Sequence, residues 1–324
     1  MTNLLEVRDA TKVFRNGPFW ARDTTTAVDK VNLILTAEQP SITGIVGESG
    51  SGKTTLAMLV LGQLRPDSGS LIFNGKNINA MTPAERRRMR REVQPIYQDP
   101  FASFNPFYKV NHALTEPLRN FMLANSPLES ERLIHHALEL AGLRPAETLG
   151  RYPHQLSGGQ RQRIMVARAL LCKPTLIVAD EPVSMLDASL RATILAGLQT
   201  LNRELGISIL YITHDLTTAY QICDRVLVMY AGSVVEFGTT EHVIREPKHP
   251  YTQLLISSIP SVKQTQQWAD TVALDVDQIS PASPKANSGC KFAPRCQSVM
   301  NNCWTTAPPL SQIDTDRAVA CLLY

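Results

Sequence analysis

The stretch that most restricts how this chain can fold is a glycine-rich segment at residues 47–54, with the spacing Gly-x4-Gly-Lys-[Ser/Thr]. The apolar residues before it are typical of a buried strand, and residues 55–61 after it of a helix. Glycines let successive backbone N–H groups converge on an anion, and a helix start adds a favourable dipole. We therefore predict a phosphate-binding loop formed by Gly47, Glu48, Ser49, Gly50, Ser51, Gly52, Lys53 and Thr54.

Polar side chains follow two continuous apolar runs further along the chain. Residues 175–179 lead into Asp180 and Glu181, and residues 207–213 lead into His214. Continuous apolarity is typical of a parallel strand that is buried on both faces. Carboxylates at the end of such a strand are costly to bury without a cation, so a metal ion and a water molecule are the natural explanation.

The rest of the chain alternates between strand-like and helix-like segments, which indicates an α/β fold with a helical insertion. We expect strands at 4–8, 27–35, 71–73, 93–98 and a hairpin at 225–230 and 234–237, a loop at 15–26, helices at 83–91 and 160–171, and a helical region at 110–149. From residue 261 the sequence is polar and then rich in Pro and Ser up to 288, which is typical of a linker.

Composition excludes several functional classes. The 324 residues allow one large or two smaller domains. Charged residues make up 19%, and a net charge of only +3 is too balanced for a nucleic-acid-binding protein. The N-terminus lacks an apolar signal core, and no apolar run approaches the ~18 residues that span a bilayer. We expect a cytoplasmic chain whose membrane role, if it has one, depends on a partner.

Six cysteines divide into two groups. Cys172 and Cys223 lie singly in apolar surroundings and are expected to be inert core thiols. The other four lie within the last 35 residues, where clustering in a cytosolic chain favours a metal or cluster site over disulfides. Zinc, an iron–sulfur cluster and four free thiols are the three interpretations for Cys290, Cys296, Cys303 and Cys321.

Over residues 3–260, the order of these motifs resembles that of the ATP-binding-cassette (ABC) ATPases. The motifs are the phosphate loop, Gln98, the signature Leu-Ser-Gly-Gly-Gln at 156–160, Asp180–Glu181, Leu186–Asp187 and His214. The five-residue signature is highly specific when it lies between a phosphate loop and an acidic strand end. The resemblance implies a P-loop NTPase core with an antiparallel β subdomain, an α-helical insertion and a small cysteine-containing C-terminal extension.

The resemblance also implies roles for individual residues. Phe14 would stack on adenine, and Gln98 would contact Mg²⁺ or the attacking water. Asp180 would hold Mg²⁺ through water, alongside the Thr54 hydroxyl. Glu181 would be the general base for the hydrolytic water, and His214 would contact the γ-phosphate. Lys53 would reach the β- and γ-phosphates.

The signature implies a dimer with two shared ATP sites. Its residues would close over the ATP that the opposite subunit holds, and Thr55 and Asp187 are also among the implied nucleotide contacts. The implied signature residues are Ser157, Gly158, Gly159 and Gln160.

A narrower similarity points to the dipeptide and oligopeptide (peptide/nickel) uptake branch. Residues 97–100, 103–106, 152–155 and 249–252 are similar to that branch, as is the four-cysteine tail. The implied domains are an ABC nucleotide-binding domain at 1–260 with a helical subdomain at about 100–155, a linker at 261–288 and the extension at 289–324. Some members of the branch hold a [4Fe–4S] cluster in this tail, which favours that cluster over zinc here.

The resemblance implies an ATPase that powers import of peptides from the cytoplasmic face of the membrane. Its partners would be two permeases, a second related ATPase and, indirectly, an extracytoplasmic substrate-binding protein; no nucleic acid is expected. Oligosaccharides, glutathione or nickel chelates are alternative solutes, since the sequence contains no site for the cargo. A soluble, non-transport ABC ATPase and a redox sensor built on the cysteine tail are the remaining alternatives.

Overall fold

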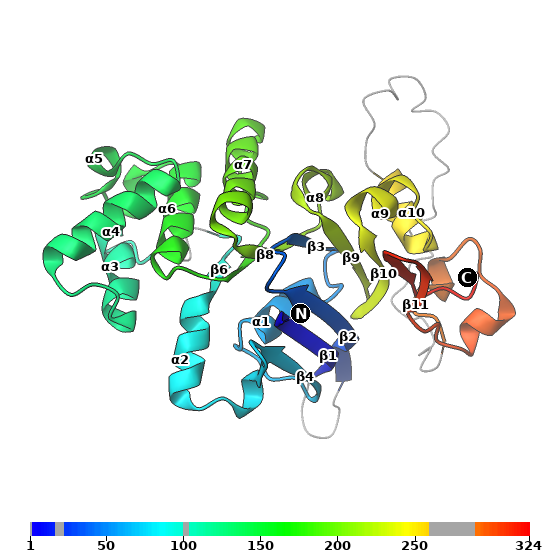
Figure 1. The fold of residues 1–324 in the computed structure, drawn as a ribbon. Helices are drawn as coiled ribbons and strands as arrows, with labels where there is room; N and C mark the ends of the chain where they lie inside the picture. The colour runs from blue at the N-terminus through cyan, green and yellow to red at the C-terminus, as the bar shows by residue number, and fades with distance from the viewer. Residues whose placement is uncertain (1, 17–22, 100–103, 259–288) are drawn as a thin grey trace, which may run out of the picture.

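The strand before the phosphate loop lies in the interior of the larger of two sheets. The computed structural model describes residues 2–16, 23–99, 104–258 and 289–324. Within these residues, the larger sheet has the strand order β11-β12-β10-β9-β3-β8-β7-β6, and the smaller has the order β2-β1-β4-β5 (Figure 1). This mixed architecture confirms the predicted α/β fold class.

Four parallel strands form the part of the larger sheet that carries the candidate site. They are β3 (Ile42–Val46), β8 (Ser208–Thr213), β7 (Leu176–Asp180) and β6 (Val93–Ile96). Every residue of β3 and β8 is buried, as expected for continuous apolar runs covered on both faces. Val46 pairs with Thr213, and Asp180 with Ile212, so the carboxyl ends of these strands meet at one edge.

The smaller, antiparallel sheet consists of β1 (Asn3–Asn16), β2 (Asp23–Thr36), β4 (Ser68–Phe73) and β5 (Lys76–Asn77). The loop predicted at 15–26 was placed too broadly, because both strands continue until Asn16 pairs with Asp23. Three successive threonines, residues 24–26, pair with residues 13–15 of β1, and β-branched side chains favour this extended pairing. Residues 17–22 lie outside the described part.

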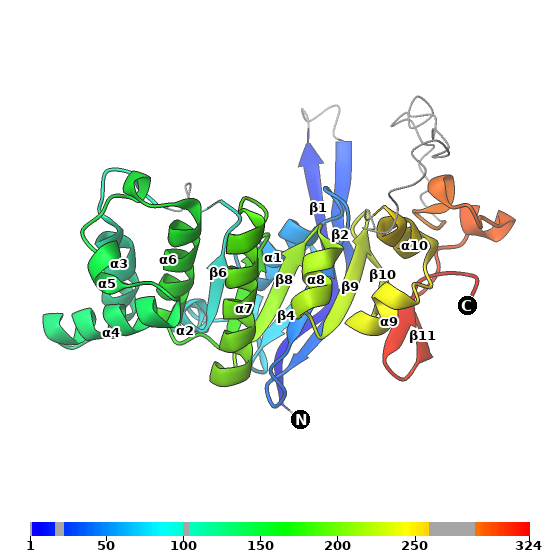
Figure 2. The ribbon, with the colours of Figure 1, turned by 90° about the horizontal axis from the view of Figure 1, so that it is seen from above.

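The predicted helical region forms a group of helices at one end of the molecule (Figures 1 and 2). It contains α3 (Val110–Phe121), α4 (Pro127–Leu140) and α5 (Pro145–Thr148), and α3 and α4 pack against α6 (Gly158–Leu171). The helix predicted at 83–91 is α2 (Pro83–Glu92). Its Thr82 hydroxyl accepts the Glu85 N–H while the Glu85 carboxylate accepts the Thr82 N–H, which satisfies two free donors at the helix start.

The remaining helices follow strands of the larger sheet. They are α1 (Lys53–Val60) after β3, α7 (Ala188–Leu205) after β7, α8 (Leu216–Ile222) after β8, and α9 (Thr240–Arg245) and α10 (Pro250–Ser257) after the hairpin β9 (Arg225–Tyr230) and β10 (Ser233–Thr239). The hairpin and α1 were predicted, whereas α7, α8, α9 and α10 were not. Among the described residues, no helix is both long and apolar enough to cross a membrane.

The C-terminal extension adds two strands to the larger sheet. They are β11 (Ser311–Asp314) and β12 (Arg317–Val319), which pair with each other, and β12 also pairs with β10. The Arg317 guanidinium lies 2.6 Å from a Glu236 carboxylate oxygen, with side chains 2% and 0% exposed. A buried charge is tolerated only when it is paired, so this contact ties the extension firmly to β10. The predicted linker at 261–288 lies outside the described residues.

His249, whose backbone N–H donates to the Glu236 carboxylate, leads us to expect that the stability of the fold depends on pH. It is 2% exposed, and burial lowers its pKa to about 4, against an unfolded value of about 6.5. The unfolded chain therefore binds a proton that the folded state excludes. The contribution of neutral His249 to the free energy of unfolding is fully present above the unfolded pKa of about 6.5 and is lost as the pH falls towards 4. We expect the free energy of unfolding to fall by about 2 kcal/mol between pH 7.5 and pH 5 from this group.

Urea unfolding of the wild type and of His249→Asn at both pH values measures this contribution. The asparagine keeps an acceptor for the Tyr251 N–H, which His249 Nδ1 accepts at 3.0 Å, but it does not titrate. Other groups titrate equally in both proteins, so the difference between the two pH dependences isolates His249. Equal pH dependences would contradict the prediction.

Candidate nucleotide-binding site

The phosphate loop connects β3 to α1, and its backbone geometry requires glycine at two positions. Gly47 and Gly52 have φ values of 152° and 102°. A Cβ atom at Gly47 would lie 2.2 Å from the Met229 carbonyl oxygen, and one at Gly52 would lie 2.0 Å from the Ala27 carbonyl oxygen. Any side chain at either position would collide with a neighbouring strand, so only glycine allows the loop to curl against the sheet.

Lys53 begins α1 and turns its side chain back over the loop. Its Nζ atom donates to the carbonyl oxygens of Gly47 at 2.7 Å and Glu48 at 2.8 Å. The residue is 6% exposed, and burial lowers the pKa of its ammonium group, partly offset by the nearby carboxylates. The ammonium is thus held inside the curve of the loop, where an anion in the loop would meet it.

Asp180 is the last residue of β7, and its carboxyl group is hydrogen-bonded to Thr54, the second residue of α1. Burial raises the pKa of its carboxyl group, while a hydrogen bond from Thr54 lowers it. Because a buried carboxylate is costly without a cation, this pair of oxygen ligands suits a hard divalent ion such as Mg²⁺. The donor set present therefore fits the metal that the sequence predicted.

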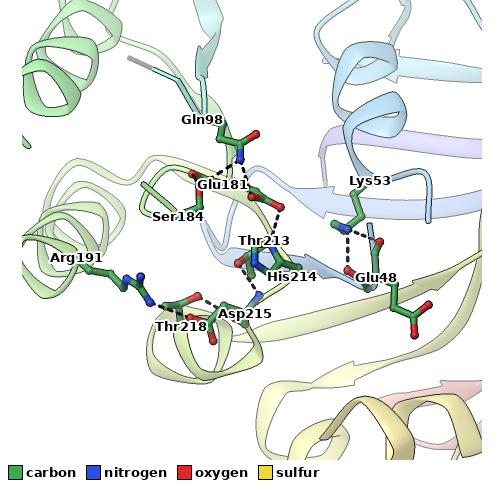
Figure 3. A network of polar contacts seen from close by, with 11 residues as sticks. Glu48, Lys53, Gln98, Glu181, Ser184, Arg191, Thr213, His214, Asp215 and Thr218 are labelled. Atoms are coloured by element: carbon green, nitrogen blue, oxygen red, sulfur yellow. Dashed lines mark hydrogen bonds and ion pairs between the residues drawn. The ribbon is translucent and has the colours of Figure 1, made fainter. Parts of the chain in front are cut away.

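Glu181 is held between two polar side chains from neighbouring strand ends (Figure 3). The Gln98 Nε2 atom donates to one carboxylate oxygen at 3.0 Å, and the His214 Nδ1 atom lies 2.7 Å from the other. Glu181 has a φ of 46°, an uncommon left-handed conformation for a residue other than glycine. Such strain is characteristic of functional sites, and here it accompanies a carboxylate fixed at both oxygens.

These residues surround one cavity of about 620 Å³. The lining residues are Ala27, Gly47, Glu48, Ser49, Gly50, Gly52, Lys53, Thr54, Thr55, Gln98, Glu181, His214 and Leu255. A second cavity of about 420 Å³ shares Thr54 and Gln98 with the first and reaches Asp180. The structure thus brings together the residues predicted to bind phosphate, to hold the metal and to act as the base. Ser51 is the one residue of the predicted loop that is absent from the lining, because it is buried.

Other predicted contacts lie outside these two cavity linings. Phe14 is partly buried on β1, where its backbone pairs with that of Thr25 on β2. The centre of its ring lies 5.8 Å from the Lys12 Nζ atom. In the signature, Ser157 and Gln160 bond to each other at the start of α6: the Ser157 hydroxyl accepts the Gln160 N–H at 3.2 Å. Asp187 is exposed immediately before α7. Gly158 and Gly159 begin α6 with the same signature.

Sequence reasoning missed two residues that contact the phosphate loop. The Tyr251 hydroxyl accepts the Glu48 N–H at 2.8 Å, and the Arg295 guanidinium donates to both Glu48 carboxylate oxygens at 2.9 Å. Tyr251 belongs to a motif noted at 249–252, but nothing in that motif indicated a contact about 200 residues earlier. Arg295 lies between two cysteines that drew attention to metal binding instead.

The metal centre predicted at the four C-terminal cysteines is not supported by the structure. In the part of the chain that the structure describes, no group of three or more His, Cys, Asp or Glu side chains is arranged to hold a metal ion. Burial raises the pKa of the Cys290 and Cys321 thiols, and for Cys321 the other three cysteines raise it further. The thiols nevertheless lie close enough to influence one another, and the structure by itself supports neither the [4Fe–4S] cluster nor zinc.

Comparison with known proteins agrees with this geometry. The chain matches the ABC transporter family over residues 30–184. It is 40% identical to a putative peptide import ATP-binding protein of Brucella ovis over 323 residues, covering 99% of this chain and 98% of that protein. The chain belongs to the ABC transporter family. The oligopeptide transport ATP-binding protein OppF of Escherichia coli is also 40% identical, over 98% of this chain and 92% of its own length.

Solved ABC cassettes share the fold. The dimeric, post-hydrolysis structure of the cassette MJ0796 bound to ADP and Pi has a TM-score of 0.65 and 27% identity, covering 73% of this chain and 98% of that one. A second family match, the C-terminal region of oligopeptide/dipeptide transporters, covers residues 235–303 of this ABC protein. That region contains both Tyr251 and Arg295, the two loop contacts that sequence reasoning missed.

Proposed function

We propose that this chain is the ATP-hydrolysing, energy-coupling subunit of an ABC importer for dipeptides or oligopeptides. The observation that carries the proposal is the single cavity in which Lys53 and the Glu181 carboxylate face the same space above the phosphate loop. The family membership and the full-length similarity to peptide-import proteins of Brucella and Escherichia support the transport role. Because phosphoryl transfer depends mainly on positioning and charge neutralisation, such a site suits ATP hydrolysis.

In binding, the loop amides from Gly47 to Thr55 would surround the phosphates, and Lys53 would exchange its two loop carbonyls for phosphate oxygens. Phe14 is proposed to stack on adenine, as the resemblance implies. Thr54, Asp180 and Gln98 would hold Mg²⁺, which supplies positive charge to the β- and γ-phosphate oxygens when bound.

In hydrolysis, Glu181 would accept a proton from the attacking water as that water bonds to the γ-phosphorus and the bond to ADP breaks. Gln98 and His214 each hold one oxygen of that carboxylate, which fixes its direction before the substrate arrives. His214 has a side chain 57% exposed in the cavity wall and is proposed to contact the γ-phosphate. Positioning of this kind, together with charge neutralisation, supplies most of the catalysis of phosphoryl transfer.

The signature is proposed to complete the site of a second ABC subunit. Ser157, Gly158, Gly159 and Gln160 lie at the start of α6, outside the linings of the two cavities next to the phosphate loop. A helix start with free N–H groups is suited to an anion presented from outside, and the similar cassette MJ0796 was solved as a dimer. Asp187, exposed near this surface, is proposed to belong to the same shared contact.

The complex is proposed to lie on the cytoplasmic face of the membrane. It would contain two permeases and a second, related ATPase, with an extracytoplasmic binding protein that delivers the peptide. Within the chain, residues 1–260 would form the nucleotide-binding domain with its helical subdomain, and 289–324 the extension. Movement of the helical group near Gln98 would transmit nucleotide binding to the permeases.

Purification of the tagged chain in gentle detergent, with identification of every co-purifying subunit, tests this proposal. We expect two permeases and a second cassette, and the complex reconstituted in vesicles should take up labelled peptides only with ATP and the binding protein. Recovery with ribosomes or nucleic acid would contradict the transport role. Uptake of an oligosaccharide, glutathione or a nickel chelate instead of peptides would contradict the proposed cargo alone.

A further inference from the structure

The phosphate loop carries a carboxylate that is unfavourable for its proposed ligand. Glu48 is the second residue of the loop and lines the cavity, with its side chain 40% exposed. A triphosphate has several negative charges, so an uncompensated carboxylate beside it would repel it. The loop therefore needs a means to neutralise Glu48 and to hold its side chain aside.

Two groups from the C-terminal third of the chain perform these tasks. Arg295 binds both Glu48 carboxylate oxygens through two parallel hydrogen bonds of 2.9 Å, and the Tyr251 hydroxyl accepts the Glu48 backbone N–H. Paired hydrogen bonds of this kind fix both the position and the direction of a carboxylate. In Figure 3 the Glu48 carboxylate points away from the Lys53 ammonium and from Glu181.

Arg295 is itself held in place by the extension. It ends the short turn Ala293–Arg295, and its guanidinium carbon lies 5.8 Å from the Tyr230 ring centre and 5.7 Å from that of Phe292. Phe292 is 2% exposed and packs against Tyr230 and Tyr251. The Lys291 ammonium binds the Asp29 carboxylate at 2.7 Å, which anchors the same turn to β2. The guanidinium therefore reaches Glu48 from a rigid base.

We propose that Arg295 is a positioning residue for nucleotide binding, which neutralises the Glu48 carboxylate and keeps it out of the phosphate space. Through this contact the C-terminal extension sets the affinity of the phosphate loop for anionic nucleotides. The hydrogen bonds to Glu48 raise the pKa of Arg295 above its ordinary value, so its charge is constant at any physiological pH. The inference rests on the proposed function, because it assumes that ATP occupies the loop.

The test is the dissociation constant of ATP for the purified full-length chain, measured calorimetrically with EDTA present to prevent turnover. Arg295→Gln is expected to weaken ATP binding about tenfold at low salt, because the freed carboxylate then repels the phosphates. The loss should shrink as salt is raised, since added ions screen this repulsion. In the double variant Arg295→Gln with Glu48→Gln, the repelling charge is gone and affinity should return to within about threefold of the wild type.

Two controls separate the charge effect from a loss of structure. Arg245→Gln removes an exposed arginine that pairs with Glu241 on α9, outside the linings of both cavities, and it should leave ATP affinity unchanged. Arg295→Lys keeps the charge and should retain most of the affinity, even if the glutamine variant proves unstable. Unchanged binding in Arg295→Gln, or a loss that Glu48→Gln does not restore, would overturn the inference. A wild-type chain that does not bind ATP would instead overturn the proposed function.

Discussion

Replacing Glu181 with glutamine is expected to slow ATP hydrolysis by a factor of about 100 to 10,000, the range that a general base typically contributes. Glutamine has the same shape and still has a carbonyl oxygen to accept the Gln98 hydrogen bond, but it takes no proton from water. ATP binding should remain near the wild-type level, because Lys53 and the loop amides are unchanged. A closed dimer loaded with ATP should therefore accumulate.

Single-turnover hydrolysis and gel filtration with ATP measure the two effects separately. Glu139→Gln is a matched control, since Glu139 is exposed on α4 in the helical group and outside the cavity linings. This control should hydrolyse ATP at the wild-type rate. Unchanged turnover in Glu181→Gln would exclude Glu181 as the base, and a loss of ATP binding would mean that its role is structural.

Replacing Lys53 with alanine is expected to weaken ATP binding by roughly 2–5 kcal/mol, the usual cost of removing one partner of a buried charge pair. At the larger end this is a loss of more than a thousandfold in affinity. The residue is 6% exposed with its ammonium held inside the loop, and no other lysine or arginine is among the lining residues of this cavity to replace its positive charge. Alanine also frees the Gly47 and Glu48 carbonyl oxygens, which then face the phosphates.

Calorimetric titration with ATP tests this prediction, with thermal unfolding to show that the variant is folded. Lys76→Ala provides the comparison. Lys76 is exposed on β5, pairs with Glu85 and does not belong to the linings of the two cavities next to the loop. Its ATP affinity should match the wild type. Near-normal affinity in Lys53→Ala would contradict the phosphate role of the lysine.

The local chemistry of the site was predictable because short-range sequence patterns encode it. The glycine spacing before Lys53 fixes a loop conformation, and an apolar run that ends in Asp180 and Glu181 fixes a buried strand with acids at its end. Gln98 and His214 were assigned to the same site by the family resemblance, and the parallel strands bring the ends that carry them to one edge. The structure places all of them there.

One prediction was wrong in its bounds, and another found no support in the structure. The loop at 15–26 was drawn too wide, because pairing of three threonines with β1 extends both strands beyond what local polarity indicated. A metal or cluster site was inferred from the crowding of Cys290, Cys296, Cys303 and Cys321 along the chain, and the family resemblance favoured a [4Fe–4S] cluster there. The fold keeps the four thiols close enough to influence one another, but the described residues include no group of three or more side chains arranged to hold a metal ion.

The sequence by itself determined the phosphate loop and the acidic strand end, since each depends on residues close together along the chain, and the order of such short motifs determined the family. Only the tertiary structure decided that β12 joins β10 and that Arg295 contacts a glutamate 247 residues before it. It alone also gave Glu181 its left-handed backbone and its two fixed partners. Such contacts follow from the packing of whole elements, which no local spacing of residues records.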